Sequence, residues 1–163
     1  MKSALWLCGP PRSAGRRQGF PSRFWLYFKR EFAANGERGL HLFGGSAPDW
    51  PRVDNDPEAV AEFTQDAFAL PPPGQAGQYD IVLCDPPYTK RFSDDWGVEQ
   101  PSPKAVLEAA RQWVKPGGLV ALLHILVPAR PKWAEREAII GVLSGPHNVI
   151  RCLSVFRVLG EGR

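Results

Sequence analysis

The residues best suited to chemistry in this chain are four consecutive ones near its middle. Asp85, Pro86, Pro87 and Tyr88 directly follow an apolar run that begins at Tyr79. Proline donates no backbone N–H and stiffens the backbone, so this turn can hold a carboxylate and a backbone carbonyl as preorganised hydrogen-bond acceptors. The adjoining tyrosine ring can stack on a flat group. An ordinary turn after a strand is the simpler alternative.

Glycines and carboxylates occur upstream, where other apolar stretches end. Gly44 and Gly45 follow one such stretch, and Asp54 and Asp66 stand at the ends of two further candidate strands. Ligands of open α/β sheets bind at the carboxyl ends of the strands, so we expect these residues to converge with Asp85 on one crevice. The simpler alternatives are a plain glycine turn, a helix cap at Asp54 and a loop cap at Asp66.

The elements expected to position these residues alternate between strands and helices. Helices are predicted over 21–34, 102–114 and 132–143, and strands over 39–43, 52–56, 63–68, 79–85, 119–127 and 148–159. This order, with short connections, predicts an α/β fold with a mostly parallel sheet. A parallel crossover normally contains a helix, and the segment 47–53 has no room for one. We expect the helix at 21–34 to cover the sheet face left bare.

In this order of motifs the sequence resembles the class I S-adenosylmethionine-dependent methyltransferases. Within them it is similar to the amino-methyltransferases with an (Asp/Asn/Ser)-Pro-Pro-(Tyr/Phe) motif, of which the DNA adenine methyltransferases are an example. The matching stretches are LHLFGGSA, VDNDP, DAFALP, CDPPY and VKPGGLVAL. The resemblance covers 39–127 and implies a single-domain, Rossmann-like open sheet with helices on both faces, its first crossover helix reduced or absent. Residues 1–20 would form a basic, partly irregular segment, and 21–163 a single methyltransferase-like domain.

The resemblance also implies roles for individual residues. Asp85 and the Pro86 carbonyl would accept the two protons of an exocyclic amine and free its lone pair, while Tyr88 stacks on the base. The catalytic residues would thus be Asp85, Pro86, Pro87 and Tyr88. S-adenosylmethionine would be the cofactor, and the residues implied to bind it are Phe43, Gly44, Gly45, Ser46, Asp54, Asp66, Ala67 and Asp85.

The implied activity is methyl transfer to an exocyclic amine of a base, first of all adenine N6 in DNA. Guanine in RNA and a glutamine amide in a protein are alternatives served by related motifs. A third interpretation is a non-catalytic nucleic-acid-binding module on a degenerate methyltransferase fold. After the motif, positive charge mixes with aromatic rings, as on single-strand-binding surfaces, although a flexible lid is equally compatible. The substrate-binding candidates are Tyr88, Lys90, Arg91, Phe92 and Trp96.

Charge is unevenly distributed, because every charged side chain in 1–30 is basic although the whole chain carries a formal net charge of only +3. Clustered basic residues favour a nucleic-acid partner, here DNA before RNA. A solvated tail or a transit peptide would show the same composition. A homodimer or a partner subunit is left open.

The three cysteines, Cys8, Cys84 and Cys152, are far apart and lack metal-ligand spacing. We therefore expect reduced thiols, a cytoplasmic protein and no metal site. Cys84 lies within an apolar strand and is expected to be a core residue rather than a nucleophile. No apolar run is long enough to cross a bilayer, so no membrane partner is expected.

Overall fold

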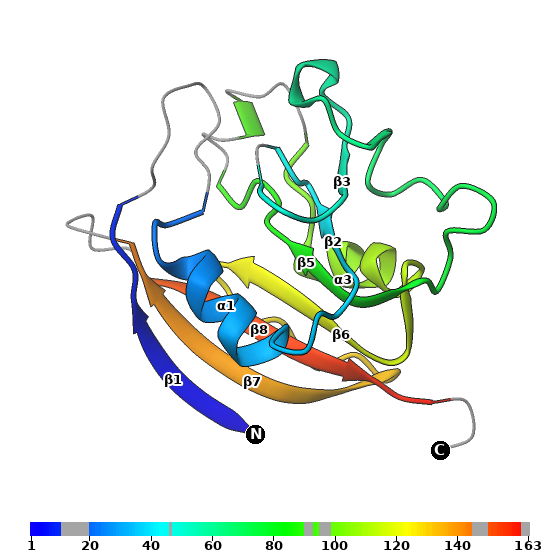
Figure 1. The fold of residues 1–163 in the computed structure, drawn as a ribbon. Coiled ribbons are helices and arrows are strands. Elements are labelled where there is room, and N and C mark those ends of the chain that lie inside the picture. Colours follow the sequence, from blue (N-terminus) through cyan, green and yellow to red (C-terminus); the bar gives the residue numbers. More distant parts are fainter. Residues whose placement is uncertain (11–19, 46, 90–92, 95–98, 145–149, 161–163) are drawn as a thin grey trace.

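An eight-stranded sheet with the order β1-β7-β8-β6-β5-β2-β3-β4 forms the centre of the molecule (Figure 1). The computed structural model describes residues 1–10, 20–45, 47–89, 93–94, 99–144 and 150–160. The strands are β1 Lys2–Leu7, β2 Gly39–Leu42, β3 Arg52–Asp54, β4 Phe63–Thr64, β5 Tyr79–Cys84, β6 Val114–His124, β7 Ala134–Leu143 and β8 Ile150–Val158. With them are helix α1 Phe24–Phe32, helix α3 Pro103–Arg111 and the 3-10 turn η1 Pro57–Ala59. β8 is antiparallel to β6 and β7, and the other described pairings are parallel, which confirms the predicted mostly parallel α/β sheet.

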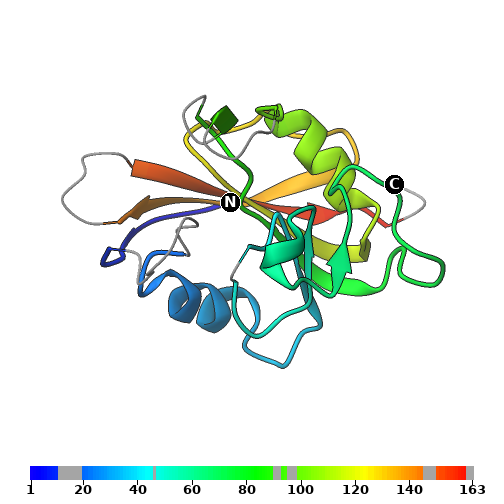
Figure 2. The same cartoon turned by 90° about the horizontal axis from the view of Figure 1, so that it is seen from above.

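Helices α1 and α3 cover opposite faces of this sheet (Figure 2). The central strand β5 packs against both layers, with Ile81 and Leu83 on the α1 side and Val82 and Cys84 on the α3 side. A strand buried on both faces must be apolar almost throughout, which explains the run that precedes Asp85. The expectation of helices on both faces is confirmed.

The connection between β2 and β3 contains no helix in its described residues, as the short segment predicted. Instead, the fully buried Phe24 and Phe28 of α1 pack with side chains of β5 to β8, and α1 also contacts the β2–β3 connection. The Trp25 indole N–H donates to Asp49 Oδ2 at 2.9 Å, and its ring meets Trp50 edge-on at 4.9 Å. The N-terminal helix therefore packs against the connection and covers the face that a crossover helix would otherwise cover.

Trp50 can reach α1 because it lies directly over Gly39 at the start of β2. A Cβ at this position would come within 2.1 Å of the Trp50 ring. Real Cβ atoms do not approach so closely, so the glycine is required for the indole to lie on the strand.

Helix α3 begins as its sequence predicts, but it ends before the predicted boundary at 114. The Ser102 hydroxyl accepts a hydrogen bond from the Ala105 amide at 3.2 Å, and Pro103 occupies the first turn. These are favourable positions for a cap and for a proline. The helix ends at Arg111, and β6 already begins at Val114.

The helix predicted over 132–143 is wrong, because Ala134–Leu143 forms strand β7. Its Ala, Glu and Arg content favours a helix, but its burial alternates along Ala138, Ile140 and Val142 with the period of a strand. Pairing with β1 on one side and β8 on the other satisfies its backbone. The connection between β6 and β7 consequently contains no helix.

The first residues of the chain also belong to the sheet. β1 (Lys2–Leu7) pairs in parallel with β7 and is the outermost strand on that side. Residues 11–19, which hold much of the basic N-terminal segment, lie outside the described part of the chain.

Candidate functional site

The carboxyl ends of β2, β3, β5 and β6 meet at one edge of the sheet, because these strands are parallel and adjacent. Leu42 lies beside Cys84, and Cys84 lies beside Leu122, so the residues that follow these strands emerge next to each other. The antiparallel strand β8 begins at the same edge. The fold thus brings the glycine turn, Asp54 and the Asp85–Tyr88 motif to a common edge, as the sequence predicted.

Asp85 is the first residue after β5, and its amide donates to the Leu42 carbonyl at 3.4 Å. Its side chain is 19% exposed, and burial raises the pKa of its carboxyl to about 6. Pro86 and Pro87 are buried. The Gln100 side-chain amide donates to the Tyr88 carbonyl at 3.0 Å and fixes the end of the turn. An acidic side chain with a raised pKa therefore sits at the centre of the edge, in a held backbone.

Arg151, which sequence reasoning did not single out, lies beside this motif. It comes from β8, and its side chain is only 9% exposed. Its Nη1 lies 3.8 Å from Asp85 Oδ1, and its Cζ lies 5.8 Å from the centre of the Tyr88 ring. A charged residue inside the apolar run IRCLSVF was the signal that a buried partner existed.

His124, at the end of β6, contacts the other side of the motif. Its ring meets the Tyr88 ring edge-on, with 5.8 Å between centroids. Nδ1 accepts a hydrogen bond from the Leu126 amide at 3.0 Å, so the proton of the neutral ring lies on Nε2. Burial lowers the pKa of this histidine and keeps it neutral near pH 7. His124 is 1% exposed, and its ring packs on the candidate site.

Asp54 faces the glycine turn at the end of β2. Its Oδ2 accepts from the Gly45 amide at 2.8 Å, and its Oδ1 accepts from the Asp56 amide at 3.0 Å. The helical turn η1 is capped by Asp56, whose Oδ1 accepts from the Glu58 amide at 2.9 Å. The capping role considered for Asp54 therefore belongs to Asp56, and Asp54 is the acid that faces the turn.

The segment after β4 brings Asp66 and two neighbours near the same turn. Asp66 Oδ1 accepts from the Phe68 amide at 2.9 Å, so this acid does cap its own loop. Ala67 is 4% exposed and belongs to the core on the α3 side. The half-exposed Phe68 ring meets Phe43 at 5.7 Å between centroids. Phe43 has a φ of +59°, a rare conformation for a bulky side chain that is common at functional turns.

Arg52 ties the glycine turn to the next connection. Its guanidinium donates to the carbonyls of Gly45 at 3.0 Å, Ala59 at 3.2 Å and Val60 at 2.7 Å. A Cβ on Gly44 would lie 2.7 Å from the Arg52 side chain. Gly44 is therefore required for packing against β3. The sequence offered no signal for Arg52 beyond a cation at the start of a buried strand.

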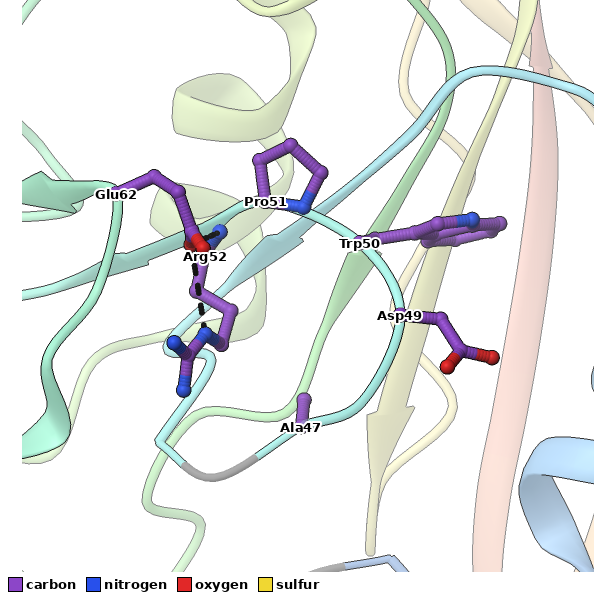
Figure 3. A pocket seen from close by; sticks show the side chains of 6 residues that line it. All are labelled: Ala47, Asp49, Trp50, Pro51, Arg52 and Glu62. Atoms are coloured by element: carbon purple, nitrogen blue, oxygen red, sulfur yellow. Dashed lines mark hydrogen bonds and ion pairs between the residues drawn. The ribbon is translucent and has the colours of Figure 1, made fainter.

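A pocket of about 450 Å³ opens on the outer side of this region (Figure 3). Its lining residues are Ala47, Asp49, Trp50, Pro51, Arg52 and Glu62. The Arg52–Glu62 ion pair, with 3.4 Å between Nε and Oε2, lies on its wall. None of the candidate residues of the motif lines this pocket, so it is distinct from the edge formed by Asp85 and Tyr88.

Five predicted site residues cannot be placed. Ser46 of the glycine turn and the substrate-binding candidates Lys90, Arg91, Phe92 and Trp96 lie outside the described residues.

Other expectations concern cysteines, metals and membranes. Cys8, Cys84 and Cys152 are all free thiols, and Cys84 is fully buried in β5 with a raised pKa. Within the described ranges, no group of three or more His, Cys, Asp or Glu side chains is arranged to hold a metal ion. Nor does the described part contain a helix long and apolar enough to span a bilayer.

Comparison with known proteins gives a likeness in fold. No family model and no curated protein matches the sequence. TrmN from Thermus thermophilus superposes with a TM-score of 0.58 at 22% identity, over 82% of this chain and 48% of that one. This chain therefore spans about half the length of TrmN.

Two further solved structures are named as methyltransferases. The putative methyltransferase yhhF from Escherichia coli matches with a TM-score of 0.60 at 10% identity, over 94% of this chain and 92% of that one. A Burkholderia thailandensis N1-methyltransferase, solved with bound S-adenosylhomocysteine, matches with a TM-score of 0.57 at 9% identity, over 83% and 76%. At these identities the likeness establishes a fold shared with methyltransferases.

Proposed function

We propose that this chain transfers a methyl group from S-adenosylmethionine to an exocyclic amine of a nucleic-acid base, with adenine N6 in DNA as the first candidate. The observation that carries the proposal is the position of Asp85–Tyr88. The motif follows the central strand β5 of a methyltransferase-like sheet, next to the glycine turn that follows β2, and Asp54 of β3 contacts that turn. These are the positions that the resemblance to amino-methyltransferases implies.

The residues present fit the cofactor's chemistry. S-adenosylmethionine, when bound, supplies an electrophilic methyl group. A carboxylate offers about four acceptor sites, so Asp54 can hold the Gly45 amide and also face ribose hydroxyls. Asp66 offers a second carboxylate, and the Phe43–Phe68 pair offers an apolar wall for a flat ring.

The motif itself fits a neutral, planar amine. The lone pair of such an amine is delocalised into the ring, and acceptors that hold its two N–H groups release the lone pair for bonding. Asp85 and the Pro86 carbonyl are the two acceptors, and the Tyr88 ring provides the stacking surface. Alignment of amine and methyl group would supply most of the rate, because about 7–11 kcal/mol is available from orientation.

The buried guanidinium of Arg151 supports a neutral amine over a cationic one. It lies next to Asp85 and Tyr88 and carries a permanent positive charge. Because its charge offsets that of Asp85, the pair presents no net negative charge that would attract an ammonium group such as that of a lysine side chain. A base amine or a glutamine amide carries no charge and needs no such attraction.

The test begins with binding of S-adenosylmethionine by isothermal titration calorimetry. It then measures tritiated-methyl transfer to an adenine-containing DNA strand, a guanine-containing RNA hairpin and a glutamine peptide. Label in DNA supports the proposal. Label only in RNA or only in the peptide would mean that RNA or protein, and not DNA, is the substrate. Wild-type protein that binds no cofactor would contradict the enzyme and favour a binding module.

A further inference from the structure

Arg151 is a charged residue in an otherwise apolar environment. It lies in β8 between Ile150 and Cys152, and its side chain is 9% exposed. Guanidinium groups do not lose their proton in proteins, so this position carries a positive charge at every relevant pH. Because a buried charge is costly without a partner, the groups around it must explain its presence.

The groups around Arg151 belong to the Asp85–Tyr88 motif. The separation of 3.8 Å between Nη1 and Asp85 Oδ1 is an ion-pair distance and exceeds that of a direct hydrogen bond. Arg151 therefore compensates the charge of Asp85 while leaving that oxygen open to a hydrogen-bond donor. The same guanidinium lies 5.8 Å from the Tyr88 ring centre, within the range of a cation–π contact.

Among the described groups near Asp85, Arg151 alone is charged at neutral pH. Burial raises the pKa of Cys84 and Tyr88, on the same segment, and lowers that of His124 on β6. The Cys8 thiol, which interacts with Arg151 and Arg23, has a pKa raised by burial to about 11. The two thiols, the phenol and the imidazole are therefore neutral near pH 7.

Two opposing effects act on the pKa of the Asp85 carboxyl. Burial raises this pKa to about 6, and Arg151 acts in the opposite direction. Without Arg151, burial would act alone, and the carboxyl would be protonated over more of the neutral range. A protonated carboxyl loses acceptor capacity toward an amine.

We propose that Arg151 is a positioning residue. It keeps Asp85 ionised as a hydrogen-bond acceptor, and it holds the Tyr88 ring in the orientation in which the substrate stacks on it. This inference rests on the proposed function for its role in catalysis. Its effect on Asp85 is a property of the protein alone and can be measured without any substrate.

The first experiment follows the Asp85 carboxyl by NMR in protein labelled with ¹³C-aspartate, assigned with Asp85→Asn. Wild type should titrate near pH 6. Arg151→Gln should raise the midpoint by one pH unit or more, and Arg151→Lys should restore most of it. The matched control is Arg157→Gln, on the same strand but half-exposed and paired with Glu137 at 2.7 Å. An unchanged midpoint in folded Arg151→Gln would overturn the proposal.

The wild type provides an independent measurement in case the Arg151 variants do not fold. The Arg151 Nε–H resonance should shift with the same midpoint as Asp85, and Asp85→Asn should abolish this shift. A resonance that does not respond to the titration of Asp85 would also overturn the proposal.

The second experiment measures the pH profile of tritiated-methyl transfer to an adenine-containing DNA strand. In Arg151→Gln the acidic limb should move upward by the same interval as the NMR midpoint, with activity partly recovered at pH 9. If the pH profile of methyl transfer is unchanged while the NMR midpoint shifts, the proposed role of Arg151 in catalysis is wrong. Absence of transfer by wild type would count against the proposed function, and the NMR titration would still decide the role of Arg151.

Discussion

The Asp54 carboxylate accepts a hydrogen bond from the Gly45 amide at 2.8 Å, so the last residue of β3 fixes the turn that follows β2. Gly45 has a φ of +46°, in the left-handed region that favours glycine. The two strands are neighbours in the sheet, yet no helix joins them in the described residues. In this shortened fold, the Asp54 side chain and the Arg52 guanidinium together order the turn beside which the cofactor is proposed to bind.

Asp54→Ala is expected to weaken binding of S-adenosylmethionine by about 10- to 100-fold. Hydrogen bonds to a charged group are worth about 1.5–3 kcal/mol each, and the substitution removes both the ribose acceptor and the support of the turn. The matched control is Asp56→Ala, which removes the cap of η1 and leaves the Asp54 carboxylate in place. Calorimetry distinguishes the two, and equal affinities for wild type and Asp54→Ala would refute the assignment.

Gly39→Ala is expected to lower the free energy of unfolding by about 1–3 kcal/mol. The new methyl group would collide with the Trp50 indole, which lies 2.1 Å from the Cβ position, and would displace it from Trp25. Urea denaturation followed by tryptophan fluorescence measures both effects. Gly160→Ala has open space around its Cβ and should leave stability unchanged. A fully stable Gly39→Ala protein would show that Trp50 does not pack as described.

Ionisation of Asp85 is expected to lower the free energy of unfolding. Its pKa is about 6 in the folded protein and about 4 in an unfolded chain, so the folded state holds the proton more tightly between these values. The free energy of unfolding therefore falls as the pH rises from 4 to 6. Asp85→Asn removes this pH dependence but also leaves the buried Arg151 without its partner charge. The stability of the variant relative to wild type should therefore rise by up to about 3 kcal/mol between pH 4 and pH 8. Chemical denaturation at several pH values measures this difference, and a constant difference would contradict the raised pKa.

Titration of His41 should change the free energy of unfolding with pH in the opposite direction. Burial lowers its pKa from 6.5 to about 4, although the hydrogen bond between Nε2 and the Pro48 carbonyl at 3.2 Å acts in the opposite direction, so the folded protein holds the ring neutral. The contribution of the neutral ring to the free energy of unfolding is complete above pH 6.5. As the pH falls toward 4, this contribution decreases by up to about 3 kcal/mol.

The His41 contribution is best measured in the Asp85→Asn background, which removes the opposing effect. There the free energy of unfolding should rise between pH 4 and 6.5, and His41→Gln should flatten that rise. A slope that survives the substitution would assign the acid sensitivity to another group.

The sequence predicted those features of the fold that depend on local pattern and chain order. The apolar run before Asp85, the absent crossover helix after Gly45 and the covering role of Phe24 and Phe28 are all local signals. The strand at Ala134–Leu143 was mispredicted because residues with good helix propensity pair there between two other strands. Tertiary pairing overrides propensity in such a segment.

The candidate site was predictable only where its residues follow one another in a motif. Arg151 and Arg52 act on groups far away in sequence, Asp85 in one case and Gly45, Ala59 and Val60 in the other. No spacing rule connects such residues before the sheet is assembled. The roles of Asp54 and Asp56 likewise became distinct only once the hydrogen bonds of each carboxylate were known.

The most direct test of the account is methyl transfer itself, with wild type and Asp85→Ala compared under identical conditions. Both proteins are incubated with tritiated S-adenosylmethionine and a single-stranded oligonucleotide that contains adenine, at pH 8. The account predicts label in the oligonucleotide with wild type and a loss of at least 100-fold with Asp85→Ala, although the variant still binds the cofactor. Equal labelling by the two proteins, or none by a wild type that binds the cofactor, would contradict it.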